Sequence, residues 1–275
     1  MKLKRDSEAN SKIIEADLRG DSIDQMKQLY IEQNTFGIDL DTPIFRIVEI
    51  ANLLSDISNK RLTHTRIGPM IWGDPAENPL LSQTFTDEVT GSSFTLESLV
   101  GDMFGVCWSL LPNATSEMWG YFSYYGKSVR IQSTPRQLLE GAMDLLNPHF
   151  MLQHFVGKIE YVSESEFDAF FEDEDFTKYL DSLGQGLALS VLKLPNDASP
   201  EQEVRLVYQI DRNQKWTQKN TKINGHFVTI PFCWDNVINN IVAGPMYKAS
   251  MCASLETELR QLGICNTLAA GYLKS

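Results

Sequence analysis

The segment from Val204 to Ile210 alternates in polarity, and it constrains the fold more than any other stretch of the chain. Its regularly spaced apolar members are Val204, Leu206, Tyr208 and Ile210, separated by Arg205, Val207 and Gln209. A period of two predicts a strand, because successive side chains of a strand point to opposite faces of a sheet. The chain therefore has to build a sheet around this segment.

Other short apolar segments predict further strands, which outnumber the long helices. The expected strands lie near residues 43–48, 104–110, 129–131, 158–162, 226–231 and 238–243, and the expected helices near 50–57, 115–125, 135–146, 163–171 and 251–262. Few strand pairs are separated by a single helix, so the regular alternation of a doubly wound parallel sheet is missing. We expect an α+β fold with largely antiparallel sheets flanked by helices.

The first 40 residues differ in character from the rest. They are polar, and Ile23, Met26, Leu29 and Tyr30 recur at helical spacing. We expect a helical N-terminal appendage over residues 1–40 and one α+β domain over residues 41–275. A chain of 275 residues can bury a core of that size.

The charge balance bears on partners. The formal net charge of −12 repels phosphate backbones and anionic lipid, so direct nucleic-acid and membrane binding are disfavoured, and small molecules or proteins are favoured as partners. No apolar run approaches the roughly 20 residues that span a bilayer, so the expected location is the cytoplasm. The oligomeric state leaves no mark in the sequence.

Metal and disulfide chemistry are not predicted. Cys107, Cys233, Cys252 and Cys265 are scattered in apolar surroundings, and we expect reduced, buried thiols. His149 and His154 are five residues apart, which does not place them on one helical face as zinc ligands. The acidic run over residues 172–175 is most simply a solvated face.

Two isolated polar residues are candidates for function. Arg46 interrupts an apolar strand, where a fixed cation needs an anion, and either a phosphate or a structural carboxylate would serve. Ser109 ends the segment Phe104–Ser109 among bulky neighbours that would hold its hydroxyl in place. A lone serine at a strand end is equally typical of a turn.

Glu201 and Glu203 form the third candidate feature, directly before the alternating segment. Ser199, Pro200 and Gln202 match a helix start, which would make both glutamates partners of a helix dipole. A strand would instead place both glutamates and Arg205 on one face. The alternation that follows favours the strand.

Together these segments resemble the bacterial family catalogued as domain of unknown function 2971. The motifs that carry the resemblance, in order, are Phe45-Arg46, the loop Trp72–Asn78, Cys107-Trp108-Ser109 with Trp119 and Tyr121, Lys193 with Glu201–Arg205, and Ile241–Pro245. The match spans roughly residues 42–275. Membership of this family assigns no reaction.

The order of arginine, serine and Glu-x-Glu on early, middle and late strands is also similar to the Arg-Ser-Glu class of ADP-ribosyltransferases. That resemblance implies a split-sheet core and NAD as substrate. It implies that Glu203 stabilises the developing oxocarbenium charge, Glu201 orients or deprotonates the acceptor, and Ser109 positions the ribose or Glu203. Arg46, with Trp108, Trp119 and Tyr121, would bind NAD, and the enzyme interpretation requires Arg46, Ser109 and Glu203 to converge on one cleft. Ser109 stands in Cys-Trp-Ser-Leu-Leu rather than in the Ser-Thr-Ser run of that class.

Two functions follow from these resemblances. One is an NAD-dependent mono-ADP-ribosyltransferase or NAD glycohydrolase of a defence or toxin type, acting on NAD; the sequence does not identify whether the acceptor is a protein, a nucleic acid or water. The alternative is a non-catalytic interaction protein of phage-defence or abortive-infection type, in which the segment from Trp108 to Tyr125 is core or partner surface. A nuclease or hydrolase that uses Asp74, Glu77 and the pair Glu201 and Glu203 around a metal ranks below both, since no histidine stands at ligand spacing.

Overall fold

The computed structural model describes residues 7–87, 89–123, 127–172, 176–264 and 268–270. The α-helices are α1 (Ser7–Arg19), α2 (Ile23–Gln33), α3 (Ile50–Ser58), α4 (Pro69–Trp72), α5 (Glu97–Val100), α6 (Ser116–Phe122), α7 (Pro135–Ala142), α8 (Glu164–Glu172), α9 (Gln185–Ser190), α10 (Lys215–Asn220) and α11 (Ala249–Gln261). Short 3-10 helices are η1 (Pro75–Glu77), η2 (Pro79–Leu81), η3 (Phe150–Leu152), η4 (Phe176–Lys178) and η5 (Asn196–Glu201).

The strands are short and are spread along the whole chain. They are β1 (Thr35–Phe36), β2 (Ile44–Glu49), β3 (Arg61–Arg66), β4 (Thr84–Thr86), β5 (Ser93–Thr95), β6 (Met103–Ser109), β7 (Ser128–Ser133), β8 (His154–Lys158), β9 (Glu160–Val162), β10 (Lys193–Pro195), β11 (Glu203–Gln209), β12 (Lys222–Asn224), β13 (Phe227–Pro231), β14 (Asn240–Ala243) and β15 (Leu268–Ala270).

Local sequence explains where the helices begin. Thr134 caps α7 by accepting a hydrogen bond from the backbone N–H of Gln137 at 3.3 Å, and Pro135 occupies the first turn, where its missing N–H costs nothing. Thr115 caps α6 in the same way through the N–H of Met118. The helix starts expected at Thr134-Pro135 and near Thr115 are confirmed.

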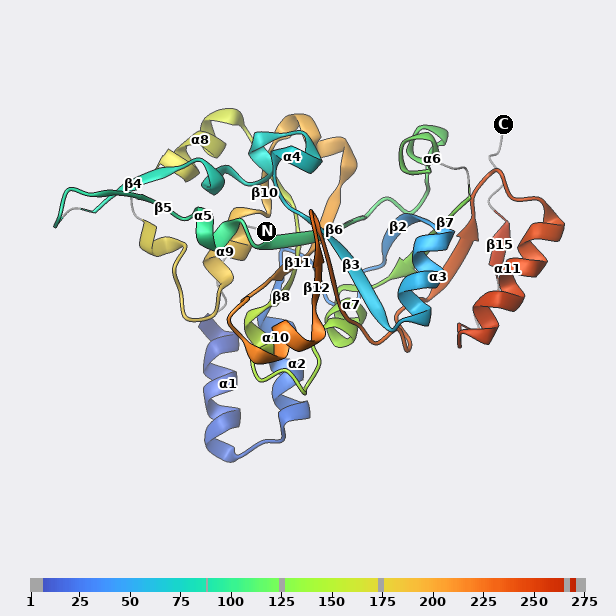
Figure 1. The fold of residues 1–275 in the computed structure, drawn as a ribbon, viewed down its shortest axis with the longest axis horizontal. Helices are drawn as coiled ribbons and strands as arrows, with labels where there is room; N and C mark the ends of the chain where they lie inside the picture. The colour runs from blue at the N-terminus through green and yellow to red at the C-terminus, as the bar shows by residue number, and fades with distance from the viewer. Residues whose placement is uncertain (1–6, 88, 124–126, 173–175, 265–267, 271–275) are drawn as a thin grey trace.

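Eleven strands of the described chain form one mixed but mostly antiparallel sheet (Figure 1). Its main path runs β1-β8-β11-β6-β2-β7-β14-β15, and β3, β13 and β12 branch from it at β6. Within this sheet only the outer pairs β1–β8 and β14–β15 are parallel. The expected α+β class with largely antiparallel pairing is confirmed.

The sheet divides at β6. Strand β3 pairs with the start of β6 through Thr65–Gly105 and Arg66–Phe104, whereas β2 pairs with its end through Phe45–Ser109 alone. Strands β2 and β3 therefore diverge from the same neighbour, which produces a split sheet. We call the pair Phe45–Ser109 the seam.

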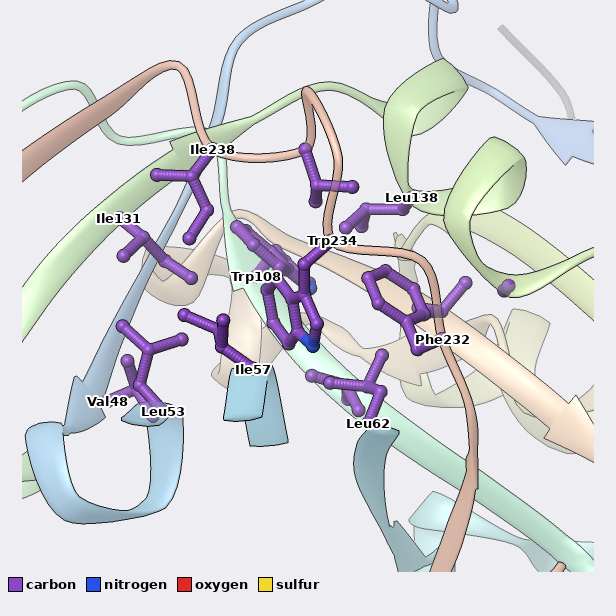
Figure 2. Close-up of a cluster of buried hydrophobic side chains, with 14 of the residues drawn as sticks. Val48, Leu53, Ile57, Leu62, Trp108, Ile131, Leu138, Phe232, Trp234 and Ile238 are labelled. Carbon is purple, nitrogen blue, oxygen red and sulfur yellow. The ribbon is translucent and has the colours of Figure 1, made fainter. Parts of the chain in front are cut away.

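Both faces of the central strands are buried. Val204, Leu206 and Tyr208 of β11 enter one hydrophobic cluster with α3 and α7, while Val207 enters a second cluster on the opposite face. Figure 2 shows part of the first cluster, in which Trp108 and Trp234 lie between Leu62 and Ile131. The alternation of residues 204–210 thus gives a strand whose two faces both lie in protein.

The N-terminal segment forms a helical hairpin that projects from one side of the sheet (Figure 1). Ile13 and Ala16 of α1 pack against Met26 of α2. Residues Thr35–Phe36 then join the sheet edge beside β8, so the segment contributes a strand as well as two helices. The division into an appendage and one domain stays a prediction.

The cysteine prediction is correct in part. Cys107, Cys233 and Cys252 are free thiols, but Cys107 and Cys252 are only partly buried, and Cys233 is exposed because it lies in the loop after β13. Cys265 and residues 173–175 lie outside the described residues. In the described part of the chain, no helix has both the length and the apolar character needed to cross a membrane.

Candidate functional site

The centre of the candidate site is a buried ion cluster on β11. The guanidinium of Arg205, which is fully buried, donates from Nε to Glu203 Oε1 at 2.8 Å and from a terminal nitrogen to Glu203 Oε2 at 3.1 Å. The same terminal nitrogen donates to Glu77 Oε2 at 2.8 Å, and the other donates to the carbonyl of Val191 at 2.7 Å. Arg205 therefore binds two carboxylates, one from β11 and one from η1.

Three further side chains enclose this cluster. The ring of Trp72 on α4 lies 4.5 Å from the Arg205 guanidinium carbon, in a cation–π contact. The thiol of Cys107, which faces Arg205 across β6 and β11, interacts with the Glu203 carboxylate. The Tyr161 hydroxyl accepts a hydrogen bond from the backbone N–H of Glu203 at 3.1 Å. These contacts leave Glu203 4% exposed.

The cluster holds more negative charge than one cation balances. Burial raises the pKa of Glu77, although Arg205 opposes the shift. Burial lowers the pKa of Arg205, but Glu203 and Glu77 raise it by more, so the net shift is upward and the guanidinium stays charged. Burial and the Glu203 charge likewise raise the pKa of Cys107 well above its ordinary value, so this thiol is protonated.

Glu201 lies outside the strand, contrary to the expectation that it shares a strand face with Glu203. Residues up to Glu201 form η5, and Gln202 adopts a left-handed conformation with φ of 44°. That turn interrupts the period of two before β11 begins at Glu203. Glu201 is exposed, and partial burial together with the charge of Glu203 raises the pKa of its carboxyl group.

Ser109, one of the two seam residues, binds the backbone of Glu201. Its hydroxyl donates to the carbonyl of Glu201 at 2.9 Å and accepts from the backbone N–H of Leu111 at 3.1 Å. It is also the register partner of both Glu203 and Phe45, so these three side chains share one face of the sheet. The structure brings together Ser109, Glu203 and the backbone of Glu201.

An arginine that the sequence analysis did not single out completes this network. Arg130 on β7 donates to the carbonyls of Leu111, at 3.4 Å, and Pro112, and its guanidinium carbon lies 4.2 Å from the centre of the Phe45 ring. Its register partner Ile47 is two residues from Phe45, so Arg130 projects on the Ser109 face. We define the seam network as Phe45, Ser109, Leu111, Arg130 and Glu201.

Arg46 does not share that face, so the expected convergence of Arg46, Ser109 and Glu203 is wrong. Phe45 is the register partner of Ser109, and the next residue of a strand points the other way. Arg46 lies on the side of α3, where burial lowers the pKa of its guanidinium and the charge of Asp56 opposes that shift. Sequence spacing alone could not assign its face, because the β2–β6 register is set by one residue pair.

The three aromatic residues expected to bind NAD lie apart. Trp108 is 3% exposed within the α3-side core (Figure 2), and Trp119 on α6 packs near Gly244. Tyr121 is 74% exposed and contacts the ring of Phe122. Trp72, on the loop 66–82, is the aromatic residue that reaches the ion cluster instead.

Sequence signals for the missed residues exist but are weak. Arg130 interrupts the apolar strand Ser128–Ser133, as Arg46 interrupts β2, so the same sequence signal marks both arginines. Glu77 is one acidic residue in an irregular loop. Its approach to Arg205 joins positions 128 residues apart, which no local pattern encodes.

Comparison with known proteins gives remote likenesses only. No family model matches the chain, and no curated protein matches it. The resemblance to domain of unknown function 2971 thus stays a prediction.

Three solved structures of Thermus sp. 2.9 DarT are similar in structure. The complex with carba-NAD+ has 14% identity and a TM-score of 0.35, over 86% of this chain and 97% of that one. The complex with NAD+ has 13% identity and a TM-score of 0.35, over 85% and 96%. The complex with ADP-ribosylated ssDNA has 13% identity and a TM-score of 0.36, over 85% and 95%. At these values we draw no functional assignment from the likeness.

Proposed function

We propose that this protein cleaves the nicotinamide–ribose bond of NAD and transfers ADP-ribose to an acceptor. The observation that carries the proposal is the seam network, in which an exposed carboxylate, a serine and an arginine without a carboxylate partner lie around one strand end. Among the described residues, none of the ion pairs within 4 Å involves Arg130. A half-buried cation of this kind is suited to a phosphate group.

The reaction needs negative charge beside the ribose. As the bond from ribose C1′ to the nicotinamide nitrogen breaks, its electron pair leaves with neutral nicotinamide, and C1′ gains oxocarbenium character. The acceptor oxygen or nitrogen then bonds to C1′ and gives up its proton to a base. A carboxylate can meet either demand, because one carboxylate can stabilise the positive charge at C1′ and another can accept the acceptor's proton.

Accessibility divides these roles between the two glutamates. Glu201 is exposed, and its raised pKa suits a group that accepts the acceptor's proton. Glu203 uses both carboxylate oxygens on Arg205, so it contributes charge from behind the site and holds the strand entrance in position. Direct contact of Glu203 with the ribose, as the family pattern implies, stays a prediction.

Arg130 and Ser109 would orient the substrate. The guanidinium of Arg130 is held by Phe45 and two backbone carbonyls, which leaves its remaining N–H groups for a pyrophosphate. Ser109 fixes the backbone that carries Glu201. The acceptor is water for a glycohydrolase and a partner's nucleophile for a transferase, and loss of cellular NAD would be consistent with a toxin or defence role.

The test is incubation of the full chain with NAD labelled in the nicotinamide ring, with and without cell lysate as a source of acceptors. We expect nicotinamide release by the wild type and a loss of about 100-fold or more in Glu201→Gln, the scale of general-base catalysis. Arg130→Gln should raise KM more than it lowers kcat. The matched control is Glu117→Gln, an exposed carboxylate on α6.

Two results would overturn the proposal. One is the absence of nicotinamide release under both conditions, and the other is a Glu201→Gln variant as active as Glu117→Gln. Melting curves of each variant distinguish loss of chemistry from loss of fold.

One observation favours the non-catalytic alternative. On α6, Tyr121 is 74% exposed and Phe122 is 46% exposed, and their ring centres lie 5.2 Å apart. Large apolar side chains gathered on a surface are typical of protein contacts. If NAD turnover is absent while substitution of Tyr121 and Phe122 by serine abolishes co-purification of a defined partner, the interaction function replaces the catalytic one.

A further inference from the structure

A polar cavity lies beside the outer strands of the split sheet. It has a volume of about 370 Å³ and is formed by the end of α3 and the strands β3, β12 and β13. The members of its lining that matter here are Asp56, Arg61, Thr63, Lys222 and Thr229. Its volume is in the range of small-molecule sites.

Strand register brings these side chains onto one surface. Lys222 is the partner of Thr229, and Thr229 is the partner of Thr63, so the three form a row across β12, β13 and β3. The hydroxyls of Thr63 and Thr229 lie 3.5 Å apart. Arg61 stands two residues before Thr63 and therefore projects from the same face of β3.

The cavity has a local excess of positive charge in a chain whose net charge is −12. Arg61 is anchored by donating to the carbonyl of Asn220, which fixes its guanidinium at the wall. Lys222 is exposed on the same face of the sheet, two strands away on β12. Asp56 is the acidic member, and Thr63 occupies both of its oxygens, through its N–H at 3.2 Å and its hydroxyl at 2.9 Å.

We propose that this cavity binds a phosphorylated sugar, with the phosphate on Arg61 and Lys222 and the sugar hydroxyls on Thr63, Thr229 and Asp56. Two cations on one face of the sheet suit a phosphate, and hydroxyl and carboxylate oxygens suit a polyol. No member of the seam network lines the cavity, so this site is independent of the proposed NAD chemistry.

Titration of the full chain with ribose 5-phosphate, followed by calorimetry, tests the proposal, with inorganic phosphate and ribose as separate arms. We expect saturable binding of ribose 5-phosphate in the range of about 0.1–1 mM, weaker binding of phosphate, and none of ribose. The double variant Arg61→Gln/Lys222→Gln should weaken ribose 5-phosphate binding by about tenfold or more, corresponding to the loss of one charge-assisted hydrogen bond.

The control is Lys215→Gln/Lys219→Gln, which removes the same charge from exposed lysines of neighbouring α10. It should bind within about twofold of wild type. Lys222→Gln alone changes only an exposed side chain, so it remains a test if the double variant does not fold, and it should weaken binding severalfold.

Several results would overturn the proposal. They are no saturable binding of ribose 5-phosphate up to about 10 mM, an equal loss in the α10 control, and binding that is lost in Arg130→Gln but kept in Lys222→Gln. The last result would place the phosphate at the seam network instead.

Discussion

At the scale of single residues, two glutamates separated by one residue serve different purposes. Glu203 is locked by a guanidinium, whereas Glu201 is free to meet solvent, because Gln202 turns the chain through a left-handed conformation between them. That conformation costs an ordinary side chain about 1 kcal/mol or more, and it persists because its carbonyl accepts from Leu110 N–H at 3.0 Å. The pair is therefore one anchor and one accessible carboxylate.

The buried ion pair of Glu203 with Arg205 predicts that removing Arg205 lowers the free energy of unfolding strongly. Arg205→Met would leave the carboxylates of Glu203 and Glu77 buried without a cation, and such a loss typically costs about 3–5 kcal/mol of unfolding free energy. Urea denaturation of both proteins measures the difference. Adding Glu203→Gln to the variant should restore part of the stability, because one stranded charge is then removed.

The matched control for this prediction is Arg260→Met. Arg260 pairs with Glu256 on the surface of α11 at 2.7 Å, and exposed pairs one helical turn apart contribute only about 0.3–0.5 kcal/mol. Equal stability losses for the two variants would show that the Arg205 cluster contributes no more than a surface pair.

At the scale of elements, the sequence predicts the strands better than the faces they present. Polarity alternation and helix-start signals place β2, α3, β6, α7 and β11 close to their observed bounds. They do not predict that β2 meets β6 through Phe45–Ser109 alone, yet that register decides that Arg130, and not Arg46, shares a face with Ser109. Pairing between strands about 60 residues apart depends on tertiary packing, which local periodicity does not contain.

Two helical glycines predict opposite effects of the same substitution. A Cβ on Gly141 of α7 would lie 2.7 Å from the carbonyl oxygen of Cys233 and 2.7 Å from the Phe232 ring, so Gly141→Ala should destabilise by about 1–3 kcal/mol. Gly120 of α6 has nothing within 4 Å of that position, and Gly120→Ala should stabilise by up to about 1 kcal/mol through helix propensity. Thermal unfolding compares the two variants, and a shift of the same sign in both would contradict the packing of α7 on the loop after β13.

At the scale of the whole molecule, two cores on opposite faces of one sheet bury polar groups far from the candidate site. His154 stacks on Tyr208 at 4.9 Å, and His64 lies 5.9 Å from the same ring, with both imidazoles within the protein interior. Burial lowers the pKa of each histidine to about 3, and the nearby cations Arg46, for His64, and Lys27, for His154, act in the same direction. The fold therefore requires both rings to be neutral.

Stability should consequently fall as the pH is lowered from about 6.5 toward 3. Over that range the unfolded chain takes up a proton on each histidine and the folded chain does not, so unfolding is favoured by about 1.4 kcal/mol per pH unit per ring, or about 2 kcal/mol each at pH 5. Glu77, Asp56 and Glu201 act oppositely, because a raised carboxyl pKa gives stability that is lost as the pH rises.

Comparing variants separates the contribution of a histidine to the pH dependence from that of the carboxyl groups. Urea denaturation at pH 7.5 and pH 5 should show that His154→Gln loses about 2 kcal/mol less than wild type between the two conditions, whatever its absolute stability. If His154→Gln and wild type lose the same amount, His154 is charged in the folded protein and the interior around Tyr208 admits water, which would contradict the packing of β8 against β11.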